Sequence, residues 1–184
     1  MHLRKTEMEY KTVKNKNYFG RFKTEFFPPL IVITIISLIS YKLTDLDFIL
    51  FLILGYAIIW AIITHFIVKN SINRIEINNG NILIEGTEIN KIWSESNKIE
   101  NTSIRIKSQG YGRGNVEYYL KMFLPESTHI INKRKEWDYN DLIKIYNHIP
   151  NNKYKNENKD LLEKMKLKAK GYSSFEIAFG KNNK

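Results

Sequence analysis

The sequence contains no cysteine. Disulfide bonds, thiolate metal sites and cysteine nucleophiles are therefore excluded. Proline is scarce, with four residues, and the chain contains 19 acidic and 29 basic side chains. The mean hydropathy of -0.37 is that of a soluble protein, but it averages a very apolar block and a lysine- and asparagine-rich remainder. The average therefore hides the organisation of the chain.

Catalytic motifs are also missing. The chain has no GxSxG, HExxH, P-loop or GxGxxG pattern, and its four histidines are scattered. Gly110, Gly112 and Gly114 precede a strand-like segment, whereas a phosphate loop opens a helix. We therefore expect a protein that is not an enzyme, with no catalytic residue, metal site, cofactor or small-molecule substrate.

The longest apolar run extends from Phe48 to Val68 and contains no charged side chain. As a helix it is about 31 Å long, the thickness of the hydrocarbon core of a bilayer. A buried helix of a soluble core is the alternative, but such helices are usually shorter and have a polar face. The run predicts a membrane span. His65 lies near its inner end, where we expect an interfacial side chain, because neither apolar run contains an acidic partner for a proton relay.

A second apolar run precedes the first, from Phe26 to Ser40. Pro28 and Pro29 are tolerated in a first helical turn, so we predict that the helix starts there. A cleaved signal peptide is the alternative, but Leu38 and Ser40 make a poor cleavage pattern. The connection between the runs is short enough to predict an antiparallel helical hairpin, and Gly55, like Ala57 and Ala61, suits close contact between the helices.

Basic residues are distributed unevenly around this hairpin. Seven precede it, Lys42 lies in its turn and 21 follow it. The positive-inside rule then predicts an inner-membrane, multi-pass protein with both termini in the cytoplasm and the turn outside. Because the remaining charge is dispersed, the net charge of +10 does not indicate a nucleic-acid partner.

After Lys69 the hydrophobic pattern changes to a period of two. Asn78 to Asn81 separate two alternating segments and predict a β-hairpin. Asp138 is a natural N-cap for a following amphipathic helix that ends near Pro150. Further strands are expected at residues 88–93, 102–107, 116–123 and 129–132.

The order of these segments resembles a known family. Ile92-Trp93, Lys98-Ile99-Glu100, the run from His129 to Arg134 and the capped helix are similar to bacterial membrane proteins of the YcxB-like kind. The resemblance implies a transmembrane α-helical hairpin followed by a cytosolic α+β pleckstrin-homology-like domain, an antiparallel β-barrel capped by one C-terminal helix. We divide the chain into a basic N-terminal segment (1–25), the hairpin (26–68), the domain (71–150) and a basic tail (151–184).

The tail begins as a lysine- and asparagine-rich linker. From Asp160 an apolar stripe predicts a short helix that Gly171 stops, and Ser173 to Glu176 form a capping box for another helical turn. Basic amphipathic helices attach to membranes or partners, but helices this short are equally compatible with a frayed tail.

A non-enzymatic interaction module, docking a protein partner or its own copy through the cytosolic domain, is the function we expect. The alternative is an accessory subunit of a transport or channel complex, assembled through the hairpin. The first β-hairpin turn has no cation, so we expect diffuse attraction to lipid and no specific headgroup site. The binding candidates, each equally compatible with a solvated surface, are Arg105, Lys107, Tyr111, Arg113, Lys133 and Arg134.

Overall fold

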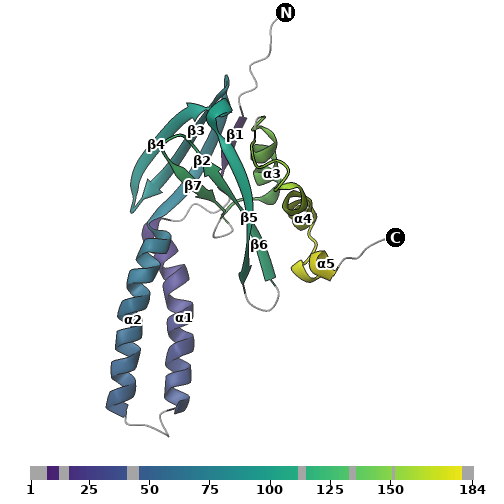
Figure 1. The fold of residues 1–184 in the computed structure, drawn as a ribbon. Helices are drawn as coiled ribbons and strands as arrows, with labels where there is room; N and C mark the ends of the chain where they lie inside the picture. The colour runs from purple at the N-terminus through teal and green to yellow at the C-terminus, as the bar shows by residue number, and fades with distance from the viewer. Residues whose placement is uncertain are drawn as a thin grey trace, which may run out of the picture. The chain divides into compact units, whose positions relative to one another are not determined.

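A computed structural model describes residues 8–12, 17–40, 46–111, 115–132, 136–150 and 152–179 (Figure 1). Three of the binding candidates, Arg113, Lys133 and Arg134, lie outside these residues. The chain divides into two units, which are described in turn. One contains residues 16–71 and 86–93, and the other contains residues 1–15, 72–85 and 94–184.

Two long helices form most of the first unit, α1 (Tyr18–Ser40) and α2 (Leu46–Val68). Both are long and apolar enough to cross a membrane, and their most apolar windows are 0% and 11% buried. Neither helix is buried in this structure as the core helix of a soluble protein would be. The expected helix contact at Gly55 is wrong, because a Cβ built there meets no atom within 4 Å.

The prediction that Pro28 and Pro29 begin the first helix is wrong. The helix begins at Tyr18, after Asn17, whose side chain accepts a hydrogen bond of 2.8 Å from the amide of Gly20. Pro29 lacks the N–H group that would bond the carbonyl of Glu25. The indole of Trp60 on α2 donates to that carbonyl at 3.4 Å, so the neighbouring helix provides the missing donor.

Polar side chains meet where α1 begins and α2 ends. The hydroxyl of Tyr18 lies 2.9 Å from Nδ1 of His65, and Nε of the buried Arg21 donates to the carbonyl of Val68 at 3.1 Å. His65 therefore has a polar partner near the end of α2, and its place at a membrane interface stays a prediction.

The larger unit contains two sheets, and the four-stranded one has the order β1-β2-β3-β4. Its strands are β1 (Met8–Lys11), β2 (Asn70–Asn78), β3 (Asn81–Glu88) and β4 (Lys91–Lys98), and the last three extend into the first unit. β1 pairs antiparallel with β2, opposing Glu9 to Glu76 and Tyr10 to Ile75. The sequence analysis assigned no strand to residues 8–11, which precede the helical hairpin.

Side chains reinforce the pairing of β1 with β2. Arg74 forms ion pairs with Glu9 on β1, Glu76 on β2 and Glu85 on β3. On the other face, the buried ring of Tyr10 lies 6.4 Å from the ring of His148. The strand is therefore held by contacts on both of its faces.

The two tight turns of this sheet differ in how well the sequence signals them. The predicted hairpin is confirmed, with Asn79 and Gly80 at φ +51° and +76° between β2 and β3. The strand predicted over residues 88–93 is confirmed only from Lys91 onward, because the chain turns at Ile89 and Asn90, with φ +50° and +85°. A β-branched residue rarely adopts a positive φ, so the sequence signals no turn there.

The second sheet has the order β5-β6-β7, with β5 (Ser103–Tyr111), β6 (Asn115–Phe123) and β7 (Thr128–Ile131). A 3-10 turn, η2 (Ile99–Asn101), precedes it. The expected strands are confirmed, and Tyr118, Leu120 and Met122 share a buried face of β6 as their spacing predicts. Within the described residues no strand pair joins the two sheets into a closed barrel.

Three helices follow, α3 (Tyr139–Asn147), α4 (Lys159–Ala169) and α5 (Ser174–Phe179). The predicted N-cap is confirmed, because Asp138 accepts from the amide of Asn140 at 2.7 Å. Gly171, at φ +90°, ends α4, and Ser173 and Glu176 form the predicted capping box with bonds of 2.8 and 3.2 Å.

The segment predicted to be a linker is attached to the second sheet. Asn158 accepts from the amide of Ile106 at 2.9 Å and donates to the carbonyl of Ile104 at 2.8 Å, while Asn152 accepts from the amide of Ile104 at 3.1 Å. These amide side chains occupy the outer edge of β5, where a neighbouring strand would otherwise bond. The edge is thereby protected without barrel closure.

The core of the larger unit is formed by both sheets together with α3 and α4. Its side chains come from alternate strand positions and from one face of each helix. The residues buried there include Ile75, Ile82, Ile84, Ile104, Ile106, Leu120, Met122, Ile131, Leu142, Ile145 and Met165.

Gly86 on β3 permits a close approach within the first unit. A Cβ built there lies 2.3 Å from Cζ2 of Trp93 and 2.5 Å from the carbonyl oxygen of Ser71. We expect Gly86→Ala to displace the indole and lower the free energy of unfolding by about 1–3 kcal/mol. Thermal unfolding in detergent, followed by tryptophan fluorescence, measures this effect.

Gly110→Ala is the matched control, because a Cβ at Gly110 in β5 meets no atom within 4 Å. The free energy of unfolding of the control should lie within about 0.5 kcal/mol of that of the parent chain. Equal losses in the two variants would contradict the contact between Gly86 and Trp93.

Candidate functional site

Cations and aromatic rings gather on the outer side of the second sheet. The guanidinium of Arg105 lies 5.4 Å from the ring centroid of Tyr154, and the ring of Tyr154 lies 5.4 Å from that of Phe123. Lys121 and Lys153 lie over Phe123 at 5.2 and 5.8 Å. We call this group the basic-aromatic face and define it as Arg105, Lys107, Lys121, Phe123, Lys153 and Tyr154.

Strand geometry explains this gathering. Ile104 and Ile106 of β5 are buried, so Arg105 and Lys107, which alternate with them, point outward. Arg105 opposes Lys121 in the register of β5 and β6. Asn152 and Asn158 hold the following segment against the edge of β5, which brings Tyr154 beside these strands.

The electrostatics of the face suit an anionic partner. It carries four cations, and the carboxylate of Glu157 neutralises part of this charge by an ion pair of 2.9 Å with Arg105. The rings hold the cations through cation–π contacts and add apolar area. Cations beside half-buried aromatic rings offer both charge and apolar area to an acidic segment.

The structure places only some of the six binding candidates, and their role in binding stays a prediction. Arg105 and Lys107 lie together on the basic-aromatic face, and Tyr111 is the last residue of β5, with its side chain outside the described part of the structure. Arg113, Lys133 and Arg134 also fall outside the described residues. Sequence reasoning missed Lys121, although its place between buried Leu120 and Met122 was a signal that it points outward.

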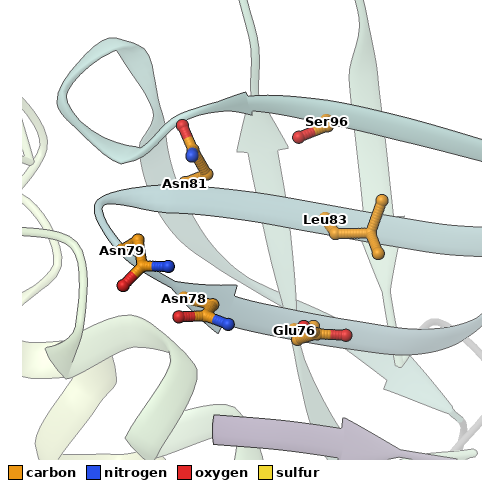
Figure 2. A pocket seen from close by; sticks show the side chains of 6 residues that line it. All are labelled: Glu76, Asn78, Asn79, Asn81, Leu83 and Ser96. Atoms are coloured by element: carbon orange, nitrogen blue, oxygen red, sulfur yellow. The ribbon is translucent and has the colours of Figure 1, made fainter. Parts of the chain in front are cut away.

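A shallow depression of about 220 Å³ lies on the four-stranded sheet (Figure 2). It is lined by Glu76, Asn78, Asn79, Asn81, Leu83 and Ser96. The carboxylate of Glu76 already bonds Arg74 at 2.8 Å, and no cation lines the depression. A phosphate headgroup would find only amide and hydroxyl partners there, so this depression does not suit a phospholipid.

Glu95, Ser127 and His129 resemble a hydrolytic triad in composition. Ser127 donates to Glu95 at 2.7 Å, and Nε2 of His129 lies 2.8 Å from Glu95 and 3.1 Å from Ser127. A triad needs one imidazole nitrogen for the serine and the other for the acid. Because Nε2 faces both groups, this arrangement cannot relay a proton from the serine.

Burial raises the pKa of Glu95, but hydrogen bonds from Ser127 and His129 outweigh it, and the net pKa is lower than that of an ordinary glutamate. A second polar cluster joins Glu117 on β6 to Tyr139 on α3 by a hydrogen bond. Burial and the bond to Glu117 raise the pKa of Tyr139, so its hydroxyl stays protonated and donates. The first cluster connects β4 to β7, and the second connects β6 to α3.

Within the described part of the chain no group of three histidine or acidic side chains is arranged to hold a metal ion. Comparison with known proteins adds no assignment: no protein-family model, no curated protein and no solved structure matches this chain. The function must therefore be argued from the strand order, the exposed helices and the basic-aromatic face.

The lowered pKa of Glu95 has a consequence for stability. A carboxyl whose pKa is lower in the folded state stabilises the fold above its unfolded value of 4.5, and this contribution is lost as the pH falls through the folded value. We expect Glu95→Gln to cost about 1 kcal/mol near neutral pH. The cost should shrink toward zero below the unfolded value, as measured by denaturant unfolding at several pH values.

Glu163→Gln, at an exposed position on α4, is the matched control and should change little at any pH. If the difference between the parent chain and Glu95→Gln stayed constant down to strongly acidic pH, the cluster would not hold an ionised carboxylate.

Proposed function

We propose that this protein is a membrane-anchored, non-enzymatic interaction module whose cytosolic domain docks an acidic protein partner. In this proposal α1 and α2 cross the inner membrane as a hairpin. Their apolar and exposed surfaces support it, because a surface of this kind is unfavourable in water and favourable in hydrocarbon.

The domain is proposed to be pleckstrin-homology-like, of the YcxB-like kind. The supporting observation is the element order, four antiparallel strands and then three, followed by the capped helix α3. The first strand of this arrangement comes from residues 8–11, so the hairpin is inserted in the chain between the first two strands of the domain.

This insertion bears on the topology. β1 precedes the hairpin and β2 follows it, and the two strands are hydrogen-bonded to each other. This pairing supports a topology in which both ends of the hairpin emerge on one side of the membrane. The basic residues on both flanks of the hairpin favour the cytoplasmic side.

The basic-aromatic face carries the docking proposal. Its cations are spread over an outward sheet face and Arg105 is already paired with Glu157, whereas a headgroup site would converge several free cations on one phosphate. A second copy of the chain would oppose like charges if it docked through the same face. An acidic protein segment with apolar side chains fits both the charge and the rings.

Charge reversal tests this proposal in native membranes. The full chain with Lys107→Glu and Lys121→Glu should recover about thirtyfold less partner on affinity isolation, since each of the two repulsive pairs weakens binding by about 1 kcal/mol. Lys98→Glu with Lys166→Glu makes the same change in charge at exposed positions on β4 and α4, outside the residues that define the face. The control should keep its partner, and equal loss in both variants would contradict docking through this face.

Gly55 supports a second candidate function, an accessory subunit assembled through the hairpin. A glycine with open space beside it permits the close approach of a helix from another membrane protein. We expect Gly55→Leu to abolish co-isolation of such a complex, whereas Ile58→Leu at an exposed position on the same helix should not. Loss with Gly55→Leu and retention with the charge reversal would favour this second function over the first.

A further inference from the structure

The β3–β4 turn lies in the same unit as the hairpin and is bonded to it. The amide of Ile89 donates to the carbonyl of Lys69 at 2.8 Å, and the side chain of Asn90 accepts from the amide of Tyr18 at 3.0 Å. Tyr18 is the first residue of α1, and Lys69 follows the last residue of α2. The turn is therefore bonded to the start of α1 and to the residue that follows α2.

The tip of this turn, residues 89–93, is apolar for an exposed β-turn. Ile89 is 43% exposed and Ile92 is 83% exposed. Lys91 is its one charged residue, and Trp93 packs on Gly86. A tip with aliphatic side chains, a tryptophan and a lysine has the composition of segments that lie at a membrane surface.

The strained backbone of Ile89 also supports a membrane-surface role for this tip. Ile89 is β-branched and adopts φ +50°, while the equivalent place in the β2–β3 turn is occupied by Asn79, which tolerates this conformation. Burial in the core does not offset the energetic cost of the positive φ at Ile89, because nearly half of this residue is exposed. An apolar side chain is thus kept at a place where asparagine or glycine would suit the backbone better.

Neighbouring side chains mark the level of the membrane surface. The amine of Lys23 lies 4.8 Å from the ring of Phe19, and that of Lys69 lies 5.6 Å from the ring of Phe66. Lysines beside exposed aromatic rings at helix ends are typical of the boundary between hydrocarbon and headgroups. The bonds from Tyr18 and Lys69 place the turn at this boundary.

We infer that the β3–β4 turn inserts Ile89 and Ile92 into the headgroup region of the cytoplasmic leaflet, as a third membrane contact beside the two helices. The inference rests on the proposed membrane insertion of the hairpin. The occupant of this apolar tip is the bilayer that holds the hairpin. The contact fixes the β3–β4 turn at the membrane surface independently of any partner.

The absence of cysteine allows a direct test, because a single introduced thiol is the only one in the chain. The full protein, with Ile92→Cys carrying an environment-sensitive fluorophore, is placed in vesicles of phosphatidylethanolamine and phosphatidylglycerol. Separate vesicle sets contain a lipid with a nitroxide quencher near the headgroup or near the end of the acyl chain. We expect at least twofold stronger quenching at position 92 by the headgroup-side nitroxide than by the deep one.

Two further single-cysteine chains make the result decisive. Lys98→Cys, six residues along β4 on the same face, should be quenched weakly by both lipids, and Ile59→Cys in the middle of α2 should be quenched most by the deep nitroxide. Quenching at 59 with no more quenching at 92 than at 98 would overturn the inference and leave the hairpin proposal standing. A blue-shifted emission at 92 without quenching would show a protein contact there and would also overturn it. Absence of quenching at 59 would overturn membrane insertion itself.

Discussion

The pairing of β1 with β2 is the interaction on which the rest of the architecture depends. It joins residues 8–11 to residues 74–77, on opposite sides of the helical hairpin in sequence. Arg74 reinforces it by ion pairs to carboxylates on three strands. The hairpin is thus an insertion within a sheet, and its two ends are bound to adjacent strands of that sheet.

This connection changes how the anchor and the domain are understood. A domain that only follows two helices is connected to them by one segment of chain. Here β1 precedes the hairpin and β2, the strand paired with β1, follows it. The β3–β4 turn, bonded to Tyr18 and Lys69, adds a contact at the same end of the helices. The hairpin is therefore attached to the sheet through the chain at both of its ends and through the hydrogen bonds of this turn.

The features that could be predicted from the sequence were those with local signals. The apolar runs, the Asn79-Gly80 turn, the alternation of β6 and the Asp138 cap each depend on residues within a few positions of one another. β1 was missed because a four-residue strand has no signal without its distant partner. The start of α1 was misplaced because the Trp60 indole, which satisfies the carbonyl freed by Pro29, comes from another helix.

The candidate site likewise combines residues that local sequence signals could place with residues that only the tertiary structure places. Arg105 and Lys107 could be assigned to one face from strand alternation alone. Lys153 and Tyr154 could not, because they reach this face through buried asparagines that bond the edge of β5 in a segment with the composition of a linker. The charge of the face is therefore a property of the tertiary structure.

The insertion of the hairpin within the sheet is tested most directly by a disulfide across β1 and β2 in native membranes. Glu9→Cys with Glu76→Cys places two thiols directly opposite each other, where Cα atoms of paired strands lie about 4.5–5.5 Å apart and a disulfide is possible. Lys11→Cys with Asn78→Cys is the control, because four residues of misregister separate these positions by about 13 Å along the strands. The account predicts a faster-migrating, reducible band on a non-reducing gel for the first pair and none for the second. Absence of the cross-link in the first pair, or equal cross-linking in both, would contradict the account.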